Sequence, residues 1–484
     1  MTNPRHRQKS LLERGLSILT PVHAGEGSIT LLMSFNVFLL LTSYYVIKPV
    51  RDALILAEGG AEARSYLVAV MAVVLFFLVQ GYATLVSRYE RTRLISVVTG
   101  GFVACLVGFW ILSRLGVGYL GYIFFVWVGI FSVMVVAQFW SYANDVYTNE
   151  SGKRLFPLVA FGGNLGSFVG AGIADGLLRY LNEFELLLVA AAMLGACIGI
   201  TSMISRRVWG RSGMRQRQQE LSRKLQQARA PDAPKEDLGF GLLRRHRYVA
   251  LIAGTVLMLN LVNTTGGYIL DKLVIVRGEQ EVEQVAAQAA AAGTNLTFGN
   301  RELGSPDDEQ ARLAYQQSWI ASFSARFFLF VNLLAFFLQL VVVHRLVKWG
   351  GVRAGLLWLP VVALGTNALI FFIPLLAVAR VGKTLENASD YSINKTVLQM
   401  LFLPTSTDIK YKAKQVVESF FQRFGDVASA VVVFVGTQVV ILGTAGFALL
   451  NVAFILLWLG LVAGIAREHR ELEAGNRPEI SGES

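Results

Sequence analysis

The stretch YYVIKPVRDALIL (44–56) decides the fold class, because it places charged side chains inside a long apolar run. Lys48, Arg51 and Asp52 follow one another at i, i+3 and i+4, so they share one face of a helix. Pro49 removes a backbone hydrogen bond beside them and favours a kink. A charge in hydrocarbon costs about 2.5–3.5 kcal/mol, so such residues usually face a bundle interior or a water-filled cavity. The stretch predicts a spanning helix with a polar face; anchoring at the outer surface is the alternative.

The whole chain has the composition of a membrane protein that crosses the bilayer many times. Hydrophobic residues make up 54% of the 484 residues and charged residues 16%, against about 25% charged in a soluble domain. Twelve apolar runs are long enough for a spanning helix, which needs about 20 residues. They are too long and too apolar for the strands of a membrane barrel. We therefore predict an all-α membrane protein with twelve transmembrane helices in two six-helix halves, a layout like that of the major facilitator superfamily.

The net charge of +11 has an uneven distribution that predicts the topology. Basic residues gather in the N-terminal segment and at 206–247, whereas the loop at 277–316 is acidic. By the positive-inside rule, both termini and the central basic segment lie in the cytoplasm. Topology accounts for the charge, so no nucleic-acid binding is expected. The predicted parts are a cytoplasmic segment 1–27, a first half 28–205, a cytoplasmic linker 206–247, a second half 248–466 with the extracytoplasmic loop 277–316, and a cytoplasmic tail 467–484.

Glycines recur every four residues in the fifth apolar run, at Gly162, Gly166 and Gly170. Small residues at that spacing let two helices approach closely, so helix packing is the main interpretation. Contact between a substrate and this bare backbone is the alternative, and Asn164 within the repeat favours it.

Several further apolar runs carry polar or charged side chains. In FWSYANDVYT (139–148) an aromatic, an amide and a carboxylate share one helical face, which suits a base or sugar; an interfacial aromatic belt is the alternative. Lys and Arg are the usual partners of phosphate, and carboxylates beside them would neutralise an empty site or take up a proton. The predicted substrate-binding residues are Lys48, Arg51, Trp140, Asn144, Asn164, Asn263, Arg326, Lys383 and Arg423. The predicted gating or proton-coupling residues are Asp52, Asp145, Glu386, Asp390, Glu418 and Asp426.

Four segments of the chain resemble the nucleotide (ATP/ADP) translocase family of plastids and intracellular bacteria. They are YYVIKPVRDALIL (44–56), FWSYANDVYTNESGKRLFPLVAFGGNLG (139–166), LNLVNTTGGYILDK (259–272) and SDYSINKTVLQMLFLPTSTDIKYKAKQVVESFFQRFG (389–425). The resemblance implies a major facilitator-like fold that exchanges ATP for ADP or imports nucleotides, in some members with protons.

The resemblance carries the family's charged residues over only in part. It places the family's basic residue of span one on Arg51, and its acid after the Ala–Asn pair of span four on Asp145. The family's acid of span seven falls on Asn263, and its basic residue of span eleven falls on Asp426, so one charge is lost and one is reversed. The chain therefore resembles a divergent member.

From these patterns we predict a secondary active transporter, an antiporter or a proton-coupled carrier, for an organic anion such as ATP or ADP. The expected partners are this small anion and membrane lipid, a monomer is the expected state, and no cofactor or metal is expected. An enzyme is not expected, because none of the 5 histidines pairs with another His, Cys or carboxylate at metal-ligand spacing. ATP hydrolysis is not expected to power transport, because no GxxxxGK[ST] phosphate loop is present. The alternatives are a proton-coupled exporter of a non-nucleotide compound and a non-transporting membrane sensor or assembly subunit.

Overall fold

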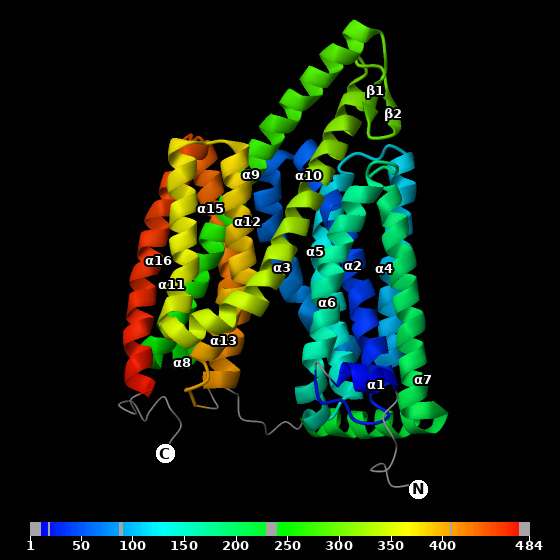
Figure 1. The fold of residues 1–484 in the computed structure, drawn as a ribbon, viewed down its shortest axis with the longest axis vertical. Coiled ribbons are helices and arrows are strands. Elements are labelled where there is room, and N and C mark those ends of the chain that lie inside the picture. The colour runs from blue at the N-terminus through cyan, green and yellow to red at the C-terminus, as the bar shows by residue number, and fades with distance from the viewer. Residues whose placement is uncertain (1–10, 18–19, 87–90, 229–239, 407–408, 474–484) are drawn as a thin grey trace. The chain divides into compact units, whose positions relative to one another are not determined.

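The chain is mostly helical in the computed structural model (Figure 1). The structure describes residues 11–17, 20–86, 91–228, 240–406 and 409–473. Within these ranges, nine helical segments have the length and the apolar character that crossing a membrane requires. One of the nine, Glu309–Phe372, covers two of the runs predicted from the sequence. The predicted class of α-helical membrane protein is confirmed, and the count of twelve spans stays a prediction.

The chain divides into two compact units. Unit 1 comprises the described residues within Met1–Leu54, Leu75–Ala233 and Gly293–Leu329, and unit 2 those within Ile55–Val74, Pro234–Ala292 and Phe330–Ser484. The two units differ from the predicted six-helix halves in two segments. Residues 55–74 of the first half pack in unit 2, and residues 293–329 of the second half pack in unit 1. In order, the first helices are α1 (Leu11–Leu16), α2 (Gly27–Glu58), α3 (Gly60–Val86), α4 (Arg91–Arg114), α5 (Leu120–Val146), α6 (Asn149–Leu177) and α7 (Glu185–Ala228).

The second part of the chain begins with α8 and the long helix α9. The elements are α8 (Phe240–Arg245), α9 (Arg247–Ala292), α10 (Glu309–Phe337), α11 (Val343–Phe372), α12 (Leu376–Ser389), α13 (Lys395–Leu401), α14 (Lys414–Val416), α15 (Gln422–Gln438) and α16 (Thr444–Glu473). Within α11, Gly351 has a φ of 65°, which only glycine adopts readily. It breaks the helix between the eighth and ninth predicted spans, 317–343 and 352–373.

Short π-helical segments interrupt the helices of the second half. They are η2 (Leu338–Val342), η3 (Asp390–Asn394), η4 (Ile409–Ala413) and η5 (Val417–Phe421). All but η2 lie within the segment 389–425, one of the four that carry the family resemblance. π-Segments are frequent at functional sites, so the backbone itself marks this part of unit 2.

The glycine repeat of α6 packs directly on the backbone of α2. A Cβ atom built on Gly162 would lie 2.4 Å from the Ser34 carbonyl oxygen, and one on Gly166 would lie 2.3 Å from the Phe38 carbonyl oxygen. A Cβ atom built on Gly170 would lie 2.6 Å from the Thr42 carbonyl oxygen. The packing interpretation of the repeat is therefore confirmed, since no larger residue fits between the two helices.

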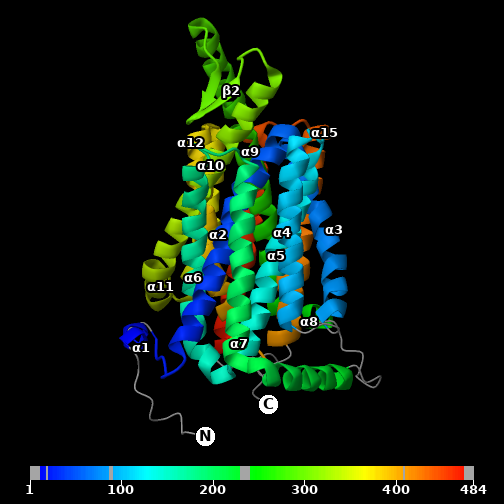
Figure 2. The same cartoon turned by 90° about the vertical axis from the view of Figure 1, so that its right-hand side faces the viewer.

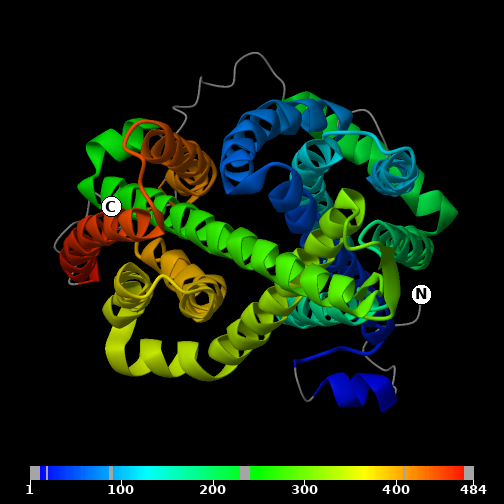
Figure 3. The same ribbon diagram turned by 90° about the horizontal axis from the view of Figure 1, so that it is seen from above.

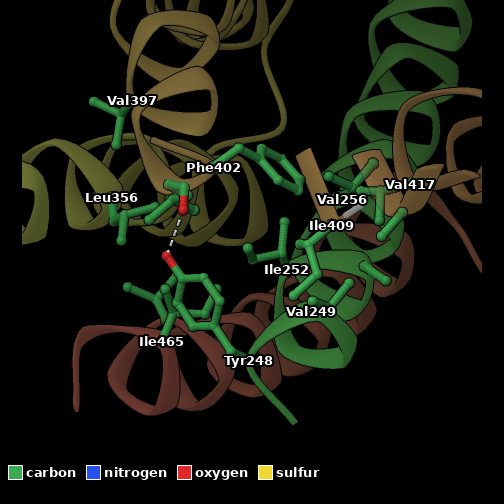
Figure 4. Close-up of a cluster of buried hydrophobic side chains, with 14 of the residues drawn as sticks. Tyr248, Val249, Ile252, Val256, Leu356, Val397, Phe402, Ile409, Val417 and Ile465 are labelled. Carbon is green, nitrogen blue, oxygen red and sulfur yellow. Dashed lines mark hydrogen bonds between the residues drawn. The ribbon is translucent and has the colours of Figure 1, made fainter. Parts of the chain in front are cut away.

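Helix α9 is the centre of unit 2, with α16, α12 and α15 packed around it (Figure 3). Near its start lies a buried apolar cluster that includes Ile252, Val256, Phe402 and Val417 (Figure 4). The hydroxyl of Tyr248 donates to the Leu401 carbonyl oxygen at 2.8 Å within this cluster (Figure 4). The phenol is thereby satisfied in an apolar core, where an unpaired polar group is costly.

A β-hairpin of unit 1, which the sequence did not predict, follows α9 (Figure 2). Strands β1 (Leu296–Phe298) and β2 (Arg301–Gly304) pair antiparallel. At its tip, Gly299 has a φ of 60°, and a Cβ there would lie 2.6 Å from the Arg179 carbonyl oxygen. The backbone N–H of Asn300 donates to that same oxygen at 2.9 Å. The alanine-rich segment before the hairpin is helical and forms the end of α9.

Arg301 also anchors the hairpin, and it lies beside the buried carboxyl group of Glu183. Arg301 Nη2 lies 3.5 Å from Glu183 Oε1 and donates to Ser318 Oγ at 2.7 Å. Burial raises the pKa of Glu183 above its ordinary value, although Arg301 and Ser318 act in the opposite direction.

Candidate functional site

Unit 1 holds Lys48 within a set of aromatic rings. Its Nζ lies 3.9 Å from the ring centroid of Phe328, 5.1 Å from that of Tyr45 and 5.8 Å from that of Tyr44. Lys48 is buried, with 9% of its surface exposed. Ring faces attract a cation, and the attraction grows when water is excluded. The rings, which the sequence analysis did not single out, therefore keep this charge at depth in the helix bundle.

Arg51 lies one helical turn further along α2 and is paired with its neighbour Asp52. Its Nε and Nη2 both donate to Asp52 Oδ1, at 2.9 and 2.7 Å. The guanidinium also stacks over the ring of Phe125, at 5.0 Å from the centroid. Asp52 is 2% exposed, so the carboxylate neutralises the guanidinium inside unit 1.

The other residues predicted in unit 1 are more exposed. Trp140 is half-buried and packs edge-on against Phe156, with 5.7 Å between ring centroids. Asn144 and Asn164 are exposed and Asp145 is half-buried. The structure therefore does not gather these side chains into one enclosed cluster.

Arg326 on α10 makes an ion pair that the sequence analysis missed. Its Nε lies 3.1 Å from Asp175 Oδ1 on α6, and about half of the Arg326 side chain is exposed. The two residues belong to different predicted six-helix halves but to the same compact unit. No local pattern signals this pair, because its members are far apart along the chain.

Arg154, in the segment 139–166, also has a defined partner. Its Nη2 lies 2.9 Å from Glu26 Oε1, and its Nη1 donates to the Pro21 carbonyl oxygen at 2.6 Å. Burial alone would raise the pKa of Glu26, but the hydrogen bond and charge of Arg154 outweigh it and lower that pKa. Arg154 thus fastens the start of α2 to the start of α6.

Unit 2 contains the most buried charged group of the chain's described part, centred on Lys383 of α12. Its Nζ donates to Glu386 Oε2 at 2.8 Å, to Asn263 Oδ1 at 2.8 Å and to the Asn263 carbonyl oxygen at 3.2 Å. An ammonium has three N–H donors, so all three are used. Lys383 is 2% exposed and Glu386 4%. The two charges thus compensate each other in the core of unit 2.

Two asparagines that the sequence analysis missed extend this network. Asn451 of α16 donates to Asn367 Oδ1 of α11 at 3.0 Å, and both residues are almost fully buried. The two asparagines lie near the lysine across Gly266, because a Cβ built there would lie 3.3 Å from Lys383 Nζ and 3.7 Å from Asn451 Nδ2. Among the described residues, Glu386 Oε1 and Asn451 Oδ1 have no hydrogen-bond partner. The network therefore has two acceptor oxygens left over.

A second charged group of unit 2 lies on α15. Arg423 Nη1 is 3.4 Å from Asp426 Oδ2, and Thr264 of α9 donates to Asp426 Oδ1 at 3.5 Å. Both charged side chains are half-buried. Gly425 lies between them in the chain, and a Cβ there would come within 2.7 Å of Asn260 Cβ, so the glycine lets α15 approach α9.

The remaining predicted carboxylates of unit 2 lie in the π-segments. Asp390 of η3 accepts from Asn394 Nδ2 at 2.8 Å. Glu418 of η5 is exposed, accepts from Gln399 Nε2 at 2.7 Å and lies 4.0 Å from Lys414 Nζ. Neither joins the Lys383 network through a direct bond between described residues.

Comparisons with known proteins agree with the resemblance stated from the sequence. Residues 6–113 match the family described as TLC ATP/ADP transporter. The ADP,ATP carrier protein 3 of Rickettsia bellii (strain RML369-C) is 20% identical over an alignment 197 residues long, which covers 34% of this chain and 39% of that protein. The matched region thus spans well under half of the curated relative, and the similarity to this family is confirmed over that part.

Solved structures show the same fold. A mutant of the nucleoside transporter NupG has a TM-score of 0.59 at 10% identity, covering 90% of this chain and 99% of that one. A mutant of the peptide transporter POT gives 0.57 at 13% identity, covering 96% and 99%. The xylose transporter XylE from E. coli, in an inward open conformation, gives 0.52 at 12% identity, covering 90% and 96%. The predicted major facilitator-like fold is confirmed. The match to a transporter family agrees with the prediction of a transporter and not an enzyme.

Proposed function

We propose that this chain is a secondary active transporter of an organic anion, a nucleotide such as ATP or ADP, working by alternating access in the bacterial inner membrane. Both termini and the linker 206–247 would lie in the cytoplasm, and a single chain would be sufficient. The similarity to the TLC ATP/ADP transporter family supports this cargo. The fold of major facilitator transporters supports the mode of transport.

The observation that carries the proposal is the pairing of basic groups with carboxylates inside each unit. Arg51 pairs with Asp52 in unit 1, and Lys383 pairs with Glu386 in unit 2. A buried charge without a partner is strongly destabilising, so the empty protein keeps these cations neutralised. A phosphate can take the place of a carboxylate on Arg or Lys, since it offers the same oxygen acceptors with more charge. The pairs would open when cargo binds and close again after release.

The departures from the family fit the same scheme. The resemblance places the family's span-seven acid on Asn263, and here the Asn263 amide oxygen still accepts from Lys383. Glu386 supplies the negative charge that the amide lacks. The reversed charge of Asp426 is balanced by Arg423. The basic and acidic groups therefore remain matched, although their positions differ from the family pattern.

In the proposal, Lys48, Arg51, Lys383 and Arg423 attract the anion, and Arg326 adds positive charge on α10. Trp140, Asn144, Asn164 and Asn263 contact the organic part or position a basic group. The acids Asp52, Asp145, Glu386, Asp390, Glu418 and Asp426 neutralise the empty protein, gate it or carry a proton.

An uptake screen in proteoliposomes tests this proposal. Labelled nucleotides, sugar phosphates and dicarboxylates are offered separately, with a cationic dye as the competing class of cargo. We expect uptake of a nucleotide that the Arg423→Glu variant loses, with dye excluded by both proteins. Dye export against a proton gradient that survives Arg423→Glu would instead support the proton-coupled exporter. No flux of any cargo through folded protein would favour the sensor or assembly subunit.

A further inference from the structure

Unit 1 contains a small cavity between the helices α2, α4, α5 and α7, with a mostly apolar lining that includes several polar side chains. Its volume is about 20 Å³, counted as the space open to the centre of a water molecule. The polar groups in its lining are Asn36, Thr99, Gln138, Tyr142, Cys197 and Thr201. None of these residues belongs to the predicted transport site.

Gln138 of α5 is the unusual member of this lining. It is 2% exposed, and neither its Oε1 nor its Nε2 has a hydrogen-bond partner among the described residues. Leaving a buried amide unsatisfied costs about 1–3 kcal/mol for each group. Native proteins rarely accept this cost without a bound water or ion to remove it.

The neighbours of Gln138 are already committed to other bonds. Asn36 Nδ2 donates to the Cys197 carbonyl oxygen at 3.1 Å and to Thr201 Oγ1 at 3.0 Å, which uses both of its N–H groups. Its amide oxygen is an acceptor on the cavity wall. Thr99 of α4 is buried and lines the same cavity. The cavity therefore offers both donors and acceptors from three helices.

The second half of the chain carries polar side chains on the corresponding helices. Counted along each half, α2, α4, α5 and α7 are the first, third, fourth and sixth predicted spans, and α9, α11, α12 and α16 are their counterparts. Two hydrogen bonds join residues of these counterparts, one from Lys383 to Asn263 and one from Asn451 to Asn367. In the first half the fourth span has the neutral Gln138 and a cavity.

We propose that this cavity binds one ordered water molecule, which joins Gln138 to Thr99 and Asn36. A water needs about 10–15 Å³ of such space and two to four polar partners, and the cavity provides both. The water accepts from the Gln138 amide and from the Thr99 hydroxyl, and it donates to an amide oxygen of Gln138 or Asn36. It fastens α5 to α2 and α4 without a charge, whereas the second half uses a lysine. The proposal does not depend on which cargo is transported.

The sign of a stability change tests the proposal in the full chain. Gln138→Met keeps the size of the side chain and removes its amide. If a water bridges the amide, the variant loses those bonds, and its Tm falls by about 1–3 °C. If the amide has no partner, removing it relieves a cost, and the Tm rises. A rise in Tm would overturn the proposal.

Thr255→Val in unit 2 is the matched control. Thr255 is also 2% exposed, and its hydroxyl has no partner among the described residues. It does not line the cavity beside Gln138. We therefore expect Thr255→Val to raise the Tm, opposite in sign to Gln138→Met.

Two further measurements locate the water. Thr99→Val should lower the Tm, and Gln138→Met combined with Thr99→Val should cost less than the sum of the two, because both remove the same bridge. Strictly additive losses would contradict a shared molecule. A high-resolution map should show one peak within hydrogen-bond distance of the Gln138 amide. A cavity without density, or with a continuous acyl chain in it, would also overturn the proposal.

Discussion

Replacing Lys383 with methionine tests whether its buried pair with Glu386 serves transport or only structure. The substitution removes three hydrogen bonds and leaves the Glu386 carboxylate, 4% exposed, without its counter-charge. Breaking a buried ion pair from one side costs about 3–5 kcal/mol. For a chain of 484 residues that unfolds as one, this lowers the Tm by about 3–5 °C. The control Lys272→Met breaks a pair with Glu62 that is much more exposed, and it should cost at most about 1 kcal/mol.

The double variant Lys383→Met/Glu386→Gln separates the two roles. It carries no unpaired charge, and the new amide can donate to Asn263, so most of the lost stability should return. Thermal unfolding of purified protein and uptake of labelled ATP into proteoliposomes are measured on the same preparations. We expect the double variant to be stable and still inactive, because the ammonium that receives the anion is gone. Uptake at the wild-type rate by the double variant would refute a role for Lys383 in binding.

Three further predictions concern packing, pH and a second ion pair. Gly166→Ala should destabilise the protein by about 1–3 kcal/mol, because its methyl group meets the α2 backbone. The control Gly172→Ala on the same helix places its Cβ 3.7 Å from Leu329 Cδ1, an ordinary contact, and should be neutral or stabilising in thermal unfolding. Burial raises the pKa of Glu183 above its ordinary 4.5, so the docked β1–β2 hairpin is most stable below pH 4.5 and loses this stability as the pH rises through the raised pKa. Hydrogen exchange of the hairpin amides, corrected for intrinsic rates, should be slower at about pH 4 than at about pH 8. Slower exchange at about pH 8 would contradict a raised pKa for Glu183. Arg64 pairs with Asp271, so Asp271→Asn should lower the Tm less in an Arg64→Gln background than in the wild type, and equal losses would show that the pair is not coupled.

Much of the fold follows from local patterns in the sequence. Long apolar runs predicted the helices, because a spanning helix needs about 20 apolar residues in succession. The spacing of Gly162, Gly166 and Gly170 predicted a close helix contact, since residues four apart share one face. These signals lie within one helix, so no knowledge of the tertiary structure is required to interpret them.

The partners of the charged residues lie beyond such patterns. Lys383 binds Asn263, 120 positions away in the chain, and Arg326 binds Asp175. Only the folded chain brings such residues together. The pair of Lys383 and Glu386 is different, because the two residues lie at i and i+3 on one helix. The same limit applies to Asn451, whose buried position in α16 resembles that of any polar residue in an apolar run.

The β1–β2 hairpin escaped prediction for a different reason. Its strands are three and four residues long, shorter than the five or six residues at which alternation becomes visible. The tight fit of Gly299 against Arg179 and the hydrogen bond from Arg301 to Ser318 fix the hairpin instead. These are tertiary contacts, and the loop sequence alone gives no sign of them.

Counterflow of ATP against ADP tests the central claim most directly. Proteoliposomes loaded with ADP are placed in labelled ATP without a proton gradient. The account predicts that label accumulates inside, that external ADP competes with it, and that Arg51→Gln and Arg423→Gln each reduce the rate while the protein stays folded. Label that stays outside, with folded protein in both orientations in the membrane, would contradict nucleotide exchange by these basic groups.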